Sequence, residues 1–335
     1  MNLRPLSLGE ILDRTAQLYR ENFLLFAGIS AVYAGVLLVL SLLQIGMQEL
    51  LGAEQMAHRL QWLTWSFSGV SMLLAFIFAG AAVAANNRAV GWVHLGEPAT
   101  IRGAYSSILP RLGRYMWLMT ITAFRVWSPL VLLYAGYFAM IFLYARPMGL
   151  LGQPGATRDN HATLPFLAAT AAFFILLIPA IIYAILMGLR YALAVPACVV
   201  ENLKARQALR RSIELSKGSR GRIFLLCLLA LSIQTGLILV TQMFFIFAAV
   251  QHHGVMSAGI RSLQQLTAFF TNTFVGPIYA TGLTLFYYDQ RVRKEGYDIE
   301  WMMQSAGLAA PAPEIAAPEA APEPAALPQT GSPHE

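Results

Sequence analysis

Charged residues are scarce in this sequence, and long apolar runs take their place. Asp, Glu, Lys and Arg together make up 12% of the 335 residues, while hydrophobic residues make up 57%. Soluble domains carry about 25% charged residues. A water-soluble fold is therefore excluded, and the apolar runs are long enough for helices that cross a lipid bilayer.

Cysteines and the common catalytic motifs are also rare or missing. The two cysteines, Cys198 and Cys227, lie beside or within apolar segments, so we expect free, buried thiols and no disulfide framework. No G-x-S-x-G elbow, glycine-rich phosphate loop, H-E-x-x-H or C-x-x-C is present. His252 and His253 are adjacent and would point apart on a helix, so they predict no metal site. We therefore predict a protein that is not an enzyme and that uses no cofactor or metal.

Six apolar stretches predict about six transmembrane helices in an all-α polytopic membrane protein. Each has about 20 residues or more, which is the length that the hydrocarbon core requires. They cover residues 23–47, 66–85, 115–144, 164–189, 223–250 and 266–288. With their connections they form a predicted helical transmembrane domain over residues 1–305. Residues 306–335 are rich in Pro, Ala and Glu and cannot build a core, so we predict a disordered cytoplasmic tail there.

The basic residues are distributed unevenly between the connections. Most of the 23 lysines and arginines lie in the N-terminal segment, after the second and fourth spans, and after the sixth. Cytoplasmic loops of membrane proteins carry such an excess. The pattern predicts a multi-pass protein of the bacterial cytoplasmic (inner) membrane with both termini in the cytoplasm. It also explains the net charge of +6 without nucleic acid binding.

The segment from Arg190 to Arg222, RYALAVPACVVENLKARQALRRSIELSKGSRGR, combines cations with a helical pattern. Residues 203–217 predict an amphipathic helix that ends at Gly218. One face is basic, and the other carries apolar and small residues: Ala205, Ala208, Leu209, Ser212, Ile213 and Ser216. We expect this helix at the membrane surface with its apolar face in the headgroup region. The alternative is a loop whose arginines only determine the topology. Residues 192–200 are too short to cross and are expected to dip into the membrane or lie flat.

Two similar segments precede other spans. Residues 7–22 begin with Ser7 and Glu10 at capping-box spacing, and residues 101–112 carry a helical apolar stripe with a predicted kink at Pro110. An amphipathic helix thus precedes a pair of spans three times. This arrangement is either a threefold repeat of helix plus hairpin or an interfacial helix at each cytoplasmic connection.

Two groups of polar residues are candidates for function. The first consists of cations on the predicted amphipathic helices: Arg102, Arg111, Arg206, Arg210 and Arg211. We predict that these arginines contact anionic headgroups of membrane lipids, or a partner protein in the membrane or cytosol. Small residues in the second span would allow a homo-oligomer without requiring one.

The second group lies within the predicted spans three, five and six: Arg125, Gln234 and Asn272. In the alternative function, that of a transporter or a lipid-handling protein, these residues would line a polar path. Snorkelling of Arg125 to the interface, and interhelical hydrogen bonds of the two amides, explain the same residues without a path.

Three motifs resemble a known bacterial membrane family. They are the opening LRPLSLGEILDRTAQLYRENF, the segment 190–222 quoted above, and TLFYYDQRVRKEGYDIEWM over residues 284–302. In these the chain is similar to the family usually labelled glycerophosphoryl diester phosphodiesterase membrane domain, over roughly residues 1–305. The label comes from fusions in which this membrane part precedes a soluble phosphodiesterase barrel of about 200 residues or more. We expect no barrel here, because only the predicted tail follows the last span. The resemblance therefore implies a membrane module that acts with partners, with no phosphodiesterase residues to carry over.

Overall fold

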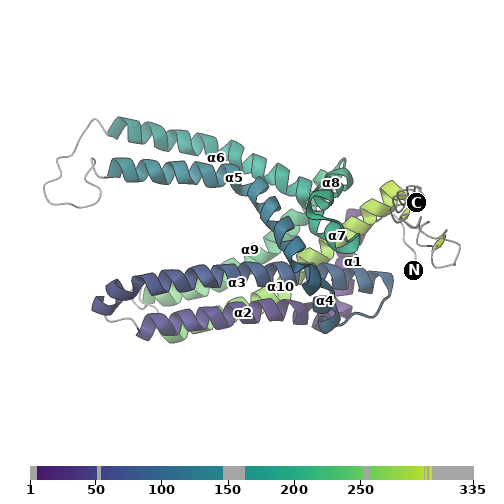
Figure 1. Cartoon of the computed structure of the whole chain (residues 1–335), viewed down its shortest axis with the longest axis horizontal. Coiled ribbons are helices and arrows are strands. Elements are labelled where there is room, and N and C mark those ends of the chain that lie inside the picture. Colours follow the sequence, from purple (N-terminus) through teal and green to yellow (C-terminus); the bar gives the residue numbers. More distant parts are fainter. Residues whose placement is uncertain are drawn as a thin grey trace, which may run out of the picture.

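The computed structural model describes residues 6–50, 54–145, 163–251, 257–297, 299 and 302–303, with the backbone alone for 54–61, 145 and 163 (Figure 1). Every regular element in these residues is a helix: α1 (Leu8–Glu21), α2 (Phe23–Leu50), α3 (Glu54–Leu95), α4 (Ile101–Ile108), η1 (Leu109–Arg111), α5 (Leu112–Ala145), α6 (Thr163–Tyr191), α7 (Ala194–Val200), α8 (Ala205–Ser216), α9 (Arg220–Gln251) and α10 (Ala258–Glu295). The predicted all-α class is therefore confirmed. The predicted tail 306–335 and the pair His252 and His253 lie outside the described residues.

Five helical segments are long and apolar enough to cross a membrane, so the protein is a polytopic membrane protein. They are Phe23–Leu50, Trp62–Leu95, Ile101–Tyr144, Leu164–Val200 and Arg220–Gln251. Each exceeds the roughly 20 residues that the hydrocarbon core requires. Five of the six predicted spans lie within these segments.

The sixth predicted span, residues 266–288, lies within α10, which is not among the five apolar segments. However, α10 runs antiparallel to α1 and α2 taken in succession. At one end Arg261 pairs with Glu49, and at the other the N–H of Leu6 donates to Asp289 at 2.7 Å. A helix that accompanies a spanning helix from end to end reaches the same two surfaces. We infer that α10 is a sixth pass, which is less apolar because much of it faces other helices.

The second predicted span is too short at its C-terminal end. The sequence predicts a polar connection from residue 86, whereas α3 continues to Leu95. Asn86 and Asn87 are buried in this helix and bind neighbouring helices. Asn86 Nδ2 donates to Ser30 Oγ at 3.0 Å, and Thr284 Oγ1 donates to Asn87 Oδ1 at 2.5 Å. Interhelical hydrogen bonds therefore keep polar residues inside a helix where their polarity alone predicts a loop.

The predicted alternation of a short helix with a helix pair is confirmed. Helix α1 precedes α2 and α3, α4 precedes α5 and α6, and α8 precedes α9 and α10, and the two long helices of each pair pack together. The capping box of Ser7 and Glu10 is present, and Pro110 lies in η1, the 3-10 turn between α4 and α5. A threefold repeat in the sequence itself stays a prediction.

Packing is densest around the C-terminal half of α10. Figure 1 shows α5 and α6 side by side, leading away from α2, α3, α9 and α10. Large apolar side chains on this hairpin are exposed, among them Phe138 and Phe174, as expected for helices that face lipid. In contrast, every residue of α10 from 281 to 290 is buried, and α10 packs against α1, α3, α7, α8 and α9. This half of α10 is the centre of the protein and positions the site described next.

Candidate functional site at the basic end

Segments that are distant in the sequence meet at one end of the protein, which we call the basic end. It is formed by residues 6–22, 95–114, 200–222 and 289–297, which belong to the connections predicted to be cytoplasmic. Arg111 and Arg114 of the second segment donate to Asn202 of the third, and Arg222 of the third donates to the carbonyl of Leu6 in the first. The segments that are rich in cations in the sequence are therefore also gathered at one end of the folded protein.

Asp289 is a buried acid at which the opening segment, the segment 190–222 and the segment 284–302 meet. Its side chain is 0% exposed. It accepts hydrogen bonds from the N–H of Leu6 at 2.7 Å and from Arg293 Nε at 3.0 Å, and it pairs with Arg222 at 3.3 Å. Both arginines also donate to the carbonyl of Leu6. One network thus joins the segment before α1, the start of α9 and the end of α10.

A second ionic network joins α8 to α10. Glu201 accepts hydrogen bonds from Arg211 Nε at 2.9 Å and from Tyr287 Oη at 2.5 Å, and Arg211 Nη2 also donates to Glu295 at 2.7 Å. Arg291 Nε lies 3.2 Å from Glu295. Burial alone would raise the pKa of the Glu295 carboxyl, but the hydrogen bonds from the two arginines outweigh it and hold this pKa below its usual value. Glu295 is therefore charged at neutral pH.

The apolar face of α8 is buried inside the protein. Its small and apolar residues pack against α5, α6, α7 and α10, and the buried ones are Ala205, Ala208, Leu209, Ser212, Leu215 and Ser216. The faces were predicted correctly, because helical spacing determines them. The expectation that the apolar face enters the headgroup region is wrong, since that face is already covered by protein.

Helix ends explain why this face contains serines and why α8 is held firmly. Ser212 Oγ donates at 2.9 Å to the carbonyl of Arg190, one of the carbonyls at the end of α6 that has no partner in its own helix. Lys294 Nζ donates to three carbonyls at the end of α8, at 2.7–3.0 Å. A cation at this position also interacts favourably with the helix dipole.

The five predicted contact arginines fall into two groups. Arg102, Arg206 and Arg210 are exposed and form no hydrogen bond or ion pair with any described residue. Arg111 and Arg211 are engaged within the protein instead. Arg111 donates at 2.5 Å to Asn202, which has a positive φ of 55° in the turn between α7 and α8. Only the first group is free to bind an external anion.

Helix α7 is part of the core. The sequence predicts that residues 192–200 dip into the membrane or lie flat, but Ala194–Val200 packs against α3, α5, α8 and α10. Pro196 lies in its first turn, where no hydrogen-bond donor is required. Cys198 is buried and Cys227 is half-buried, and both are free thiols, as predicted.

A cavity of about 360 Å³ lies at the basic end between α3 and α10. Its lining residues are Arg88, Gly91, Trp92, Leu95, Glu97, Val200, Glu201, Tyr288, Arg291 and Tyr297. The volume lies in the range of small-molecule pockets, about 300–1,000 Å³. The Arg88 guanidinium lies 5.7 Å from the centre of the Trp92 ring, and that of Arg291 lies 3.9 Å from the centre of the Tyr297 ring. Two arginines at the wall of this cavity thus form cation–π contacts with aromatic rings.

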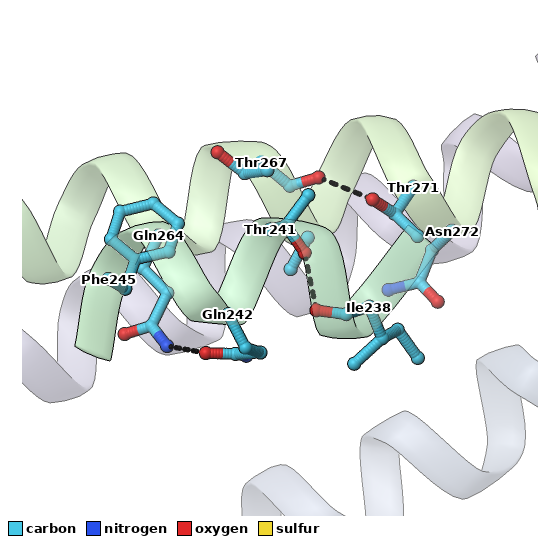
Figure 2. Close-up of a pocket in the computed structure, with 9 residues that line it drawn as sticks. Ile238, Thr241, Gln242, Phe245, Gln264, Thr267, Thr271 and Asn272 are labelled. Atoms are coloured by element: carbon cyan, nitrogen blue, oxygen red, sulfur yellow. Dashed lines mark hydrogen bonds between the residues drawn. The ribbon is translucent and has the colours of Figure 1, made fainter. Parts of the chain in front are cut away.

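The predicted intramembrane polar residues lie at separate places. Asn272 lines a cavity of about 190 Å³ between α9 and α10, in which Gln264 Nε2 donates to Gln242 Oε1 at 2.9 Å (Figure 2). Gln234 lines a different cavity of about 250 Å³, beside Tyr279. This bond is interhelical, but it joins two other glutamines. The side chains of Gln234 and Asn272 form no hydrogen bond with any described residue, so the interhelical bonds expected for these two amides are not seen.

Arg125 lines neither of these two cavities. It is exposed on α5, and its guanidinium lies 5.9 Å from the centre of the ring of Tyr191, the last residue of α6. The side chain therefore reaches toward the basic end, which favours snorkelling over a place in a polar path.

Sequence reasoning missed the residues that line the cavity between α3 and α10. Arg88 follows two asparagines just after the predicted span 66–85, a polar stretch typical of a connection, although it lies in α3. The spacing of Arg88, Gly91, Trp92 and Leu95 puts them on one helical face and could have indicated a packed helix. Within the described ranges, no three His, Cys, Asp or Glu side chains group closely enough to hold a metal ion.

Comparison with protein-family models, with curated proteins and with solved structures finds no match. The function of this protein is therefore inferred from its own residues.

Proposed function

We propose that this protein is a non-enzymatic multi-pass protein of the bacterial inner membrane, with its basic end in the cytoplasm. Support comes from the concentration of lysines and arginines at one end, because cytoplasmic segments carry such an excess. The start of α1 and the end of α10 both lie at that end, so both termini would be cytoplasmic.

We further propose that the basic end binds anionic lipid headgroups. The observation that carries this proposal is the exposure of Arg102, Arg206 and Arg210 without an acceptor in the described part of the chain. Because the apolar face of α8 is buried, the contact is electrostatic and does not involve insertion of α8. Each cation near an anionic surface contributes about 1 kcal/mol at moderate ionic strength.

The test measures lipid selectivity after reconstitution in phosphatidylcholine bilayers. Electron paramagnetic resonance of spin-labelled phosphatidylglycerol and phosphatidylcholine gives the ratio of their association with the protein. The variant Arg102→Gln/Arg206→Gln/Arg210→Gln should lose most of the preference for phosphatidylglycerol, and high salt should have the same effect on the unmodified protein.

The matched control is Arg261→Gln, which removes a cation at the opposite end, where it is already paired with Glu49. It should leave the preference intact. An undiminished preference in the triple variant would overturn the lipid proposal and would favour a protein partner for these arginines.

A further inference from the structure

Arg88 is a cation without an anion. It is half-buried in α3 at the wall of the cavity between α3 and α10, and no hydrogen bond or ion pair joins it to any residue that the structure describes. Its Nε atom is buried and has no acceptor. Arg211, Arg222 and Arg293 each pair with a carboxylate. Arg190 at the end of α6 also has a buried Nε atom without an acceptor, but Arg190 does not line this cavity. A buried guanidinium donor without a partner is costly unless a ligand or water accepts its hydrogen bond.

Tyr288 is a second unused donor in the same cavity. The residue is only 2% exposed, its side chain lines the cavity, and its hydroxyl forms no hydrogen bond within the described part of the protein. Gly91 follows Arg88 by three residues, on the same face of α3. A Cβ atom at Gly91 would lie 3.1 Å from the Tyr288 hydroxyl. The hydroxyl therefore lies directly beside the backbone of α3, close to Arg88.

The nearby acids that the structure describes form no ion pair with Arg88. Glu201 lines the cavity, but it is bound to Arg211 at 2.9 Å and to the hydroxyl of Tyr287 at 2.5 Å. Glu97 lies at the exposed rim and forms no ion pair with Arg88 within 4.0 Å. Arg291 Nε pairs with Glu295 Oε2 at 3.2 Å, and the Arg291 guanidinium lies over the Tyr297 ring. Among the described lining residues, Arg88 is thus a cation without a direct ion-pair partner, and Tyr288 adds a hydroxyl without a hydrogen bond.

We propose that this cavity binds a phosphate group, as a phosphomonoester or a phosphodiester, with Arg88 supplying the charge and the Tyr288 hydroxyl a second hydrogen bond. Phosphate oxygens match the planar fork of a guanidinium and leave further oxygens for a neighbouring hydroxyl. The cavity lies at the end of the membrane helices, where either a lipid headgroup or a soluble phosphate compound can reach it. The site is separate from the exposed arginines of the proposed lipid contact and does not depend on them.

The test uses the full chain in a maltoside detergent, which contains no phosphate. The unfolding midpoint is followed by tryptophan fluorescence during titration with inorganic phosphate, and in a second arm with dihexanoyl phosphatidylglycerol. Sodium chloride and sodium acetate at equal ionic strength are the references. We expect the midpoint to rise by several degrees with at least one phosphate probe. A rise with the lipid alone assigns the site to a headgroup, and a rise with inorganic phosphate assigns it to soluble phosphate compounds.

Three variants identify the site. Tyr288→Phe removes only the unpaired hydroxyl and should weaken binding about tenfold, a typical effect of one hydrogen bond to a charged group. Arg88→Gln should abolish the response. Arg206→Gln, which lies in the proposed lipid contact, should leave the response unchanged even if it lowers lipid selectivity.

The proposal fails if neither phosphate probe raises the midpoint above the chloride reference, or if acetate is as effective as phosphate. It also fails if Tyr288→Phe, with an unchanged midpoint in the absence of ligand, binds the probe as tightly as the unmodified protein. These results are independent of the spin-label experiment, so the two proposals can fail separately.

Discussion

Asp289 offers the most direct test of how the basic end is stabilised. Its side chain is fully buried, and Asp289→Asn would remove the charge while keeping the size and one acceptor oxygen. Removing one partner of a buried ion pair costs about 3–5 kcal/mol, because the other charge loses its compensation. The side chains of Arg222 and Arg293 are 29% and 36% exposed, so water can solvate part of both after the change. We therefore expect the lower limit, a loss of about 3 kcal/mol in the free energy of unfolding.

The assay is equilibrium unfolding in mixed micelles titrated with sodium dodecyl sulfate and followed by far-UV circular dichroism. Glu214→Gln is the matched control, because this exposed side chain at the basic end has no partner among the described residues. It should stay within about 0.5 kcal/mol of the unmodified protein. Arg293→Gln should also destabilise the protein, by about 1.5–3 kcal/mol, because it removes a hydrogen-bond donor from the fully buried Asp289 carboxylate and leaves Arg222 as the other ion-pair partner. A variant Asp289→Asn as stable as Glu214→Gln would refute the conclusion that this ion network holds the basic end together.

Glu295→Gln should reduce acid sensitivity. The pKa of Glu295 in the folded protein lies below its ordinary value of 4.5, so its stabilising effect is complete above that value and is lost as the pH falls through the lower folded pKa. Thermal melts of variant and unmodified protein should therefore differ at neutral pH and converge in acid; a constant difference would contradict this. Ala208→Leu should cost about 1–3 kcal/mol by overpacking a fully buried position, whereas Glu214→Leu on the exposed face should cost little. Equal stability of these two variants in the same unfolding assay would mean that lipid, not protein, covers the apolar face of α8. Gln264→Leu should cost about 1 kcal/mol by leaving Gln242 without its partner, and adding Gln242→Leu should restore part of that loss; additive losses would contradict the interhelical bond.

The local pattern of the sequence predicts the helices and their faces well. The capping box at Ser7, the end of α8 before Gly218 and the kink at Pro110 depend on residues only a few positions apart. Five of the predicted spans fall inside apolar helices for the same reason, since about 20 consecutive apolar residues form a local signal.

What each face touches depends on distant residues, and there the predictions fail. The stripe of Ala208 and Leu209 is compatible with lipid or with protein, and only the ends of α6 and α10 decide between them. From the sequence alone, the polar pair Asn86 and Asn87 indicates a loop. In the structure Ser30 and Thr284 form hydrogen bonds with these two residues inside a helix. Residues 281–290 of α10 show no amphipathic alternation, because the helix is enclosed on all sides at that level.

The candidate site depends on the same long-range contacts. Arg211 is one of the predicted contact residues, but whether it faces an external anion or Glu201 and Glu295 is decided by the turn after α7 and the end of α10. In the sequence, Arg88 is one more cation among those that predict the cytoplasmic side. Only the structure shows that its described neighbours leave its Nε atom without an acceptor. Composition can thus predict which end of the protein is basic, but not which cation is available.

The enclosure of residues 281–290 also has a consequence for biosynthesis. Helix α10 is the last of the described helices to leave the ribosome, yet it occupies the middle of the finished protein. Until it arrives, Asn87 and Glu201 lack partners that only α10 supplies, Thr284 and Tyr287. A chain interrupted before this helix would leave these polar groups without their interhelical hydrogen bonds. The hydrogen bond from the N–H of Leu6 to Asp289 joins the first and the last of the described segments, so the native basic end requires that α10 has been synthesised.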